Sequence, residues 1–161
     1  MNLAHLHLLI NHLPILGSVL GGLVLAYAIF MRSVQIKIVS YYLLIISSLG
    51  AAIAYATGEE AEEAVENIQG VSKDMIEQHD DFAMISLIAL VILGVASFVG
   101  LVLTFKNSVQ TRNMAFVTLF ISIISFCLVA RTGYLGGQIR HSEMSSGAAT
   151  QQNGGGDEDR D

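Results

Sequence analysis

Four long apolar stretches constrain what this chain can fold into more than any other feature. The hydrocarbon core of a bilayer is about 30 Å thick, and about 20 apolar residues of helix are needed to cross it. Stretches of that length occupy residues 8–30, 38–57, 82–105 and 114–135. Each is apolar around the whole helix, which excludes soluble amphipathic helices, because those keep a charged face toward water. The sequence therefore predicts an all-α integral membrane protein with four spans.

The links inside the two pairs of spans are short, at residues 31–37 and 106–113. Such links force neighbouring helices to be antiparallel, so we expect an up-down-up-down four-helix bundle. Lipid gives helices no hydrophobic reason to associate, and close backbone packing at small residues is expected to hold them together. Gly17 and Gly21 form a small-xxx-small pair that suits either packing within the bundle or a homodimer.

The basic residues predict the orientation in the membrane. Arg32 and Lys37 flank the first short link, Lys106 and Arg112 flank the second, and neither link contains an acidic residue. Short loops rich in Lys and Arg stay in the cytoplasm. We therefore expect a multi-pass protein of the bacterial inner membrane with both termini in the periplasm. The chain has no basic stripe of the kind that binds nucleic acid, so a nucleic-acid partner is excluded.

The remaining segments differ from the spans in composition. Glutamates recur at helical spacing after residue 58, which predicts a short interfacial helix in the outer loop. Gly70 is expected to end it, and Ser72 to cap a helix that continues into the third span. From residue 145 the chain is rich in Ser, Gly and Gln and then acidic, which is typical of disorder. We thus predict one transmembrane domain, 1–144, and a disordered acidic tail, 145–161.

All five histidines fall on the predicted outer side, and two of them are candidate ligands. His12 precedes Pro14 near the start of the first span, where the proline frees backbone carbonyls that could hold the ring. Ionisable groups at membrane depth are costly and suggest function. His79 stands beside Asp80, so a carboxylate could hold one ring nitrogen while the other binds a metal. The alternatives are an interfacial histidine bonded to a carbonyl or headgroup, and a solvated helix start.

The end of the fourth span carries a second set of candidates. Arg131 follows an apolar run and must snorkel outward, pair with an acid near His79, or bind an anion such as a haem propionate. The pair Gly136–Gly137 could let the backbone fold back over the bundle, bringing Arg140 and His141 to the site. A simple helix end followed by a tail is the alternative.

The acidic outer loop could supply oxygen ligands for a divalent metal. The candidates are Glu59, Glu63 and Glu66. Charge runs at helical spacing are more often a solvated face, and nothing in the chain has the Glu-x-x-His spacing of di-iron bundles.

Several short motifs resemble a family of bacterial four-span membrane proteins that is catalogued as a domain of unknown function and is also found fused to Rieske domains. The resemblance covers about residues 3–143, and it is carried by His12-Leu13-Pro14, Thr57-Gly58-Glu59, His79 and Gly136-Gly137. It implies a link to haem binding or respiratory electron transfer, without an established activity. The chain departs from the family pattern at Leu13, where many relatives have an aromatic residue, and in its strongly acidic outer loop.

The leading hypothesis is an electron-transfer module with an outward-facing site, and no catalytic residue is assigned. Two imidazoles from different helices could ligate haem b, with His12 and His79 as the axial pair and Arg131, Arg140 and His141 around the cofactor. A divalent metal would instead use these two histidines with Glu59, Glu63 and Glu66. Electrons would pass between a membrane quinol and an outer partner.

Two other hypotheses stay open. The chain could be a non-catalytic accessory subunit of a respiratory or transport complex, whose acidic loop docks a basic partner such as cytochrome c. A divalent-metal transporter or sensor is the weakest, because no charged residue lies in the middle of a span, where transport paths need polar groups.

Overall fold

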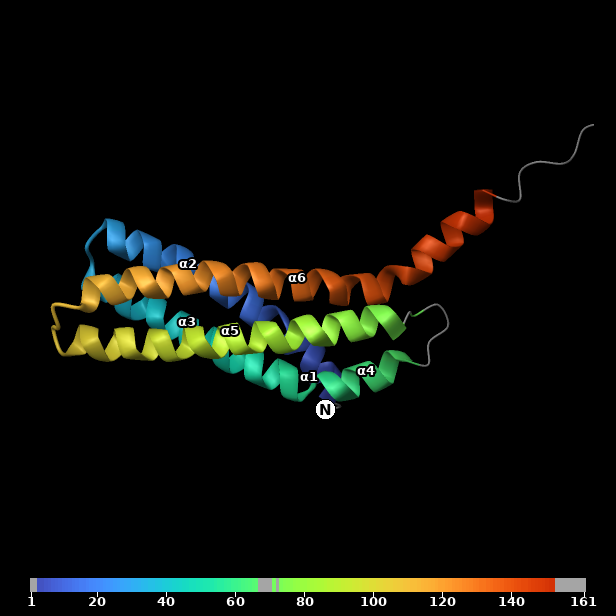
Figure 1. Cartoon of the computed structure of the whole chain (residues 1–161), viewed down its shortest axis with the longest axis horizontal. Helices are drawn as coiled ribbons and strands as arrows, with labels where there is room; N and C mark the ends of the chain where they lie inside the picture. The colour runs from blue at the N-terminus through green and yellow to red at the C-terminus, as the bar shows by residue number, and fades with distance from the viewer. Residues whose placement is uncertain (1–2, 67–70, 72, 153–161) are drawn as a thin grey trace, which may run out of the picture.

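The computed structural model describes residues 3–66, 71 and 73–152, with side chains at all of these except 64 and 140–152. Four long helices run side by side as two antiparallel hairpins, and two short helices pack against each other at one end (Figure 1). The described residues contain no strand, so the all-α bundle is confirmed. The helices in chain order are α1 (Leu3–Ile10), α2 (His12–Phe30), α3 (Val34–Ala56), α4 (Gly58–Glu66), α5 (Lys73–Phe105) and α6 (Thr111–Gln152).

The bundle has two chemically different ends, the histidine end and the basic end. The histidine end holds α1, α4, the start of α5 and the end of α3 (Figure 1). The basic end holds the two short links, at residues 31–33 and 106–110. The hairpin α2–α3 packs against the hairpin α5–α6 through contacts of α3 with α5 and of α2 with α6. Each end therefore gathers residues from all four long helices.

The helices are longer than the predicted spans because they continue into polar sequence. Four helical stretches are long and apolar enough to cross a membrane, and they run over Leu3–Phe30, Val34–Ala56, Lys73–Phe105 and Thr111–Ile139. The third begins well before residue 82 and carries His79, which confirms the predicted continuous helix. The expected helix end at Gly70 and cap at Ser72 lie outside the described residues.

The end of α6 does not have the turn at Gly136–Gly137 that was one of its two predicted structures. Gly136 and Gly137 lie inside α6, so the backbone does not fold back over the bundle at this point. Helix geometry satisfies the backbone groups at both glycines, and nothing at this position requires a turn. The helix extends to Gln152, into the segment that was predicted to be disordered from residue 145.

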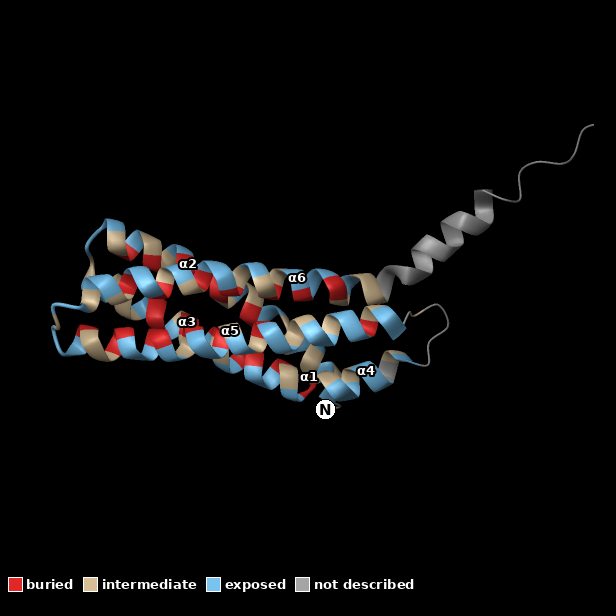
Figure 2. Ribbon diagram, in the orientation of Figure 1, coloured by how far each residue is buried: buried red, intermediate tan, exposed pale blue. Residues whose placement is uncertain are grey.

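The packing is that of a membrane protein, with small and hydroxyl-bearing residues inside and large apolar residues outside. Many large apolar side chains face outward, and Phe30 is 82% exposed. The fully buried positions, in contrast, include Ser18, Ser47, Ser97 and Ser125, and Figure 2 shows the buried residues along the facing sides of the helices. In water this arrangement would expose the apolar surface that drives folding, whereas in lipid the small residues permit close helix contacts.

The glycines of the small-xxx-small pair face a neighbouring helix of the same chain. A Cβ at Gly17 would lie 2.7 Å from Cβ of Ser47, and one at Gly21 would lie 2.6 Å from Cδ2 of Leu44. Both contacts are with α3. The pair therefore serves packing within the bundle, one of its two predicted uses.

Candidate ligand site at the histidine end

His7 is held by the end of a neighbouring helix. Its Nδ1 lies 2.8 Å from the carbonyl oxygen of Ala54 in the last turn of α3, and 3.4 Å from Oγ1 of Thr57. The same carbonyl also accepts from the backbone N–H of Thr57 over 3.3 Å and from its Oγ1 over 3.1 Å, so the ring joins the capping contacts at the end of α3. A carbonyl oxygen only accepts, which means that Nδ1 of His7 carries the hydrogen.

His79 is held in the same manner by a different pair of helices. Its Nδ1 donates to the carbonyl oxygen of Thr132 in α6 over 3.0 Å. The hydroxyl of Thr132 meets that of Ser86 over 2.8 Å, so α5 and α6 are joined by polar contacts at this level. Gly136 makes the approach possible, because a Cβ there would lie 3.0 Å from Cε1 of His79.

The two rings share one chemical state and one end of the molecule. They come from different helices, α1 and α5. With Nδ1 protonated in both, each Nε2 keeps a free lone pair. Within the described part of the chain neither Nε2 has a hydrogen-bond partner. The arrangement therefore presents two imidazole nitrogens that are oriented by the backbone and available to a ligand.

His12 does not share this environment. The helix is interrupted at Asn11, between α1 and α2, because Pro14 has no backbone N–H to donate to the carbonyl of Ile10. The carbonyl of Pro14 itself accepts from Oγ of Ser47 over 3.0 Å and is not bound by an imidazole. His12 is exposed, and no hydrogen bond to it occurs among the described residues. Thus His7, and not His12, is hydrogen-bonded to a backbone carbonyl as His79 is.

Arg131 is placed differently from the prediction of an acidic partner. Its guanidinium carbon lies 5.8 Å from the centre of the Phe82 ring and 5.4 Å from that of Tyr134. Guanidinium groups are attracted to aromatic faces at such distances. Among the described residues no carboxylate forms an ion pair with Arg131. Stacking on rings therefore replaces the expected salt bridge.

The glutamates of α4 form an exposed face beside this site. Glu59 and Glu63 are exposed, and Glu66 pairs with Lys73 over 2.8 Å, which holds the pKa of its carboxyl below the ordinary value. Partial burial raises the pKa of Glu62, with Asp80 and the neighbouring glutamates adding to the rise. The described residues contain no group of three His, Cys, Asp or Glu side chains arranged to hold a metal. The predicted set of two histidines and three glutamates is not brought together in this part of the chain.

Two predicted site residues cannot be placed, and His7 was not among the candidates from the sequence. The side chains of Arg140 and His141 are outside the described residues. Nothing in the sequence around His7 resembles a ligand motif, and its partner is a backbone carbonyl, which leaves no signal in the sequence.

Comparison with known proteins gives a family and no close relative. No curated protein matches the chain, and no solved structure matches it. A family model described as "Predicted membrane protein (DUF2231)" matches residues 4–144. That range contains His7, His79 and, apart from Leu3, all four apolar helical stretches. The chain accordingly belongs to the DUF2231 family of predicted membrane proteins.

Proposed function

We propose that this chain is an electron-transfer module of the bacterial inner membrane that binds a haem or another transition metal through His7 and His79. In this proposal the histidine end faces the periplasm, because the basic links would remain in the cytoplasm. The observation that carries it is the matched pair of imidazoles, each bonded through Nδ1 to a backbone carbonyl.

The hydrogen bonds at Nδ1 are what metal-binding histidines need. A histidine ligand usually donates its second ring N–H to a carbonyl or carboxylate, which fixes the tautomer and the direction of the free lone pair. Backbone carbonyls of α3 and α6 do this for His7 and His79. Because the acceptors belong to helix backbones, the rings are oriented before any ligand arrives.

The number of donors favours haem iron over structural zinc. A closed zinc site needs four protein ligands, and the described residues bring only two backbone-bonded imidazoles to this end. Haem iron takes two axial ligands, so a histidine pair suits it, and imidazole is also a good ligand for copper and iron in general. A haem held by His7 and His79 would supply one-electron chemistry. This chain would contribute the orientation of the two imidazoles, through the backbone carbonyls of α3 and α6.

The test is an absorption spectrum and a metal analysis of the full-length protein, purified from haem-replete cells. We expect a Soret band or stoichiometric transition metal that is lost in His7→Ala and in His79→Ala. His12→Ala is the matched control, since that ring is exposed, and it should keep the cofactor. Protein that is folded by circular dichroism but contains neither haem nor metal would reject the proposal, as would loss in the His12 variant alone.

A second function is favoured by the exposed acidic face of α4. Glu59, Glu60 and Glu63 are exposed at one end of the molecule. Such a surface would attract a basic partner, for example cytochrome c, and an accessory subunit of a respiratory complex would use it for docking. Under this function the two histidine variants would leave complex assembly intact, whereas Glu59→Gln with Glu63→Gln would weaken it. Co-purification of the host complex separates the two functions.

A further inference from the structure

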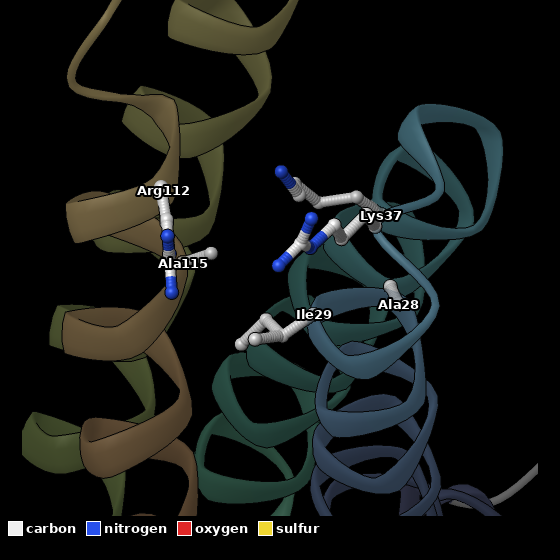
Figure 3. Close-up of a pocket in the computed structure, with 6 residues that line it drawn as sticks. Ala28, Ile29, Lys37, Arg112 and Ala115 are labelled. Atoms are coloured by element: carbon white, nitrogen blue, oxygen red, sulfur yellow. The ribbon is translucent and has the colours of Figure 1, made fainter.

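The basic end contains a pocket between helices that is lined by three cations. The pocket has a volume of about 250 Å³ and is lined by Arg32, Lys37 and Arg112 above an apolar floor of Ala28, Ile29 and Ala115. Figure 3 shows Arg112 on α6 at one side of the opening and Lys37 extending from α3 at the other. Pockets for drug-sized ligands measure roughly 300–1,000 Å³, so this one suits a small charged group.

These cations lack the partners that surface cations commonly have. Among the described residues no carboxylate forms an ion pair with any of the three, and the one contact with a ring is Arg112 over Phe116 at 5.9 Å. Three positive charges that line one pocket repel each other, and the repulsion is strongest where the surroundings are partly apolar. An anion in the pocket would remove this cost.

The helix ends around the pocket add to the positive potential. Lys37 lies in the first turn of α3 and Arg112 in the first turn of α6, and neither first turn contains an acidic residue. The amino end of a helix already carries a partial positive charge, and cations are unfavourable there. An anion bound between these helix ends would be favoured by both dipoles as well as by the side chains.

Arg32 occupies its position against the preference of its backbone. It has a φ of 51°, a left-handed conformation that favours Gly or Asn. The amides of Arg32 and Ser33 donate to carbonyls of Ile29 and Ala28, which closes the end of α2 as Gly usually does. The other link at this end has the same geometry with the residue expected there, Asn107, at a φ of 50°. Arginine at residue 32 is therefore unusual, because Gly or Asn is expected in this backbone conformation.

We propose that this pocket binds a phosphate-bearing anion, namely the headgroup of an anionic phospholipid. Arg32, Lys37 and Arg112 hold the phosphate oxygens, and Ile29 with the two alanines contacts the glycerol or the first methylenes. The lipid source is favoured by position, because the pocket lies at the end of the apolar part of α2, where Phe30, the residue after the pocket-lining Ile29, is 82% exposed. Basic pockets between transmembrane helices are suited to such headgroups. The site is at the opposite end from His7 and His79 and does not depend on the proposed electron transfer.

The test is calorimetric titration of the full-length protein in micelles of a neutral detergent. The probes are dioctanoyl phosphatidylglycerol, dioctanoyl phosphatidylcholine and inorganic phosphate. We expect binding of phosphatidylglycerol and none of phosphatidylcholine, and a weakening of about fivefold for each cation removed. The variants are Arg32→Asn, Lys37→Gln and Arg112→Gln, and Lys106→Gln is the matched control, a basic residue at the same end that does not line the pocket.

Each outcome decides a point. Binding of phosphatidylglycerol without binding of phosphate identifies the lipid as the source, and binding of both shows that the phosphate group alone is sufficient. Equal binding of phosphatidylcholine, an unchanged affinity in the triple variant, or an equal loss in Lys106→Gln would overturn the proposal. Loss of binding by Arg32→Asn is not a folding artefact, because Asn relieves the backbone, and circular dichroism with thermal melting checks this.

Discussion

The two ends of the bundle use polar residues in opposite ways. At the histidine end, His7 and His79 are bonded to helix carbonyls, and Glu66 is paired with Lys73. At the basic end, Arg32, Lys37 and Arg112 line an opening without a carboxylate partner in the described part of the chain.

The difference lies in the partners that each end offers. At the histidine end, backbone carbonyls of α3 and α6 accept hydrogen bonds from the two imidazoles. At the basic end, Lys37 and Arg112 lie in the first turns of α3 and α6, where the helix dipole disfavours cations. An anion bound there, as proposed, would supply the partner that the described carboxylates do not.

The largest effect on the free energy of unfolding is expected from Gly100→Ala, which tests how closely α5 packs against α3 near the basic end. A Cβ at Gly100 would lie 2.5 Å from Cζ of Tyr41, a fully buried side chain that has no room to move. Overpacking of this kind costs about 1–3 kcal/mol. Thermal or denaturant unfolding in micelles measures it. Gly137→Ala is the control, since nothing lies within 4 Å of its added methyl, and it should be neutral or slightly stabilising. Equal behaviour of the two variants would contradict the packing.

A smaller effect is expected from Gly136→Ala, which tests how His79 is held. The added methyl would lie 3.0 Å from Cε1 and 3.2 Å from Nδ1 of His79, so the ring must shift from the carbonyl of Thr132. Stability should fall by about 1 kcal/mol, the value of one hydrogen bond. If the proposed cofactor is bound, its affinity should fall about 10-fold or more, as for loss of a supporting contact. Titration of cofactor into stripped protein measures it, and Gly137→Ala should lower neither the stability nor the affinity.

The reverse sign is expected from Arg32→Asn without ligand. Asn adopts the left-handed conformation more readily than Arg, so the free energy of unfolding should rise by about 0.5–1 kcal/mol. Asn107→Arg, at the equivalent position of the other link, should lower it by a similar amount. Thermal melting in neutral detergent compares the two. A destabilised Arg32→Asn protein would mean that the cation stabilises its own end of the bundle.

The smallest effects are expected from pH at the histidine end. The pKa of Glu66 is lowered by Lys73, so its stabilisation is present above its ordinary value of 4.5 and is lost as pH falls through the lowered pKa. The pKa of Glu62 is raised by partial burial and neighbouring acids, so its ionised form costs stability once pH exceeds the raised pKa. Glu62→Gln should therefore stabilise at neutral pH and not in acid, and Glu66→Gln should destabilise at neutral pH. Both changes are screened at these exposed positions, and added salt should reduce them. Melting curves between about pH 3 and 7 give the signs.

Sequence alone determined that the chain is helical, spans a membrane and folds as two antiparallel hairpins. These properties depend on the length of apolar runs and of the links between them, which can be counted. The helix that contains His79 and the short acidic helix could also be predicted from the sequence, because helix caps and residue spacing are local features. Sequence did not show that His7, rather than His12, is bonded to a backbone carbonyl.

Only the tertiary structure decided which residues meet. The spans are apolar around their circumference, so periodicity does not show which face of a helix is buried. The partners of His7 and His79 are backbone carbonyls, which every residue has and which therefore leave no trace in sequence. The pocket at the basic end likewise depends on three cations from separate positions that converge once α2, α3 and α6 have packed.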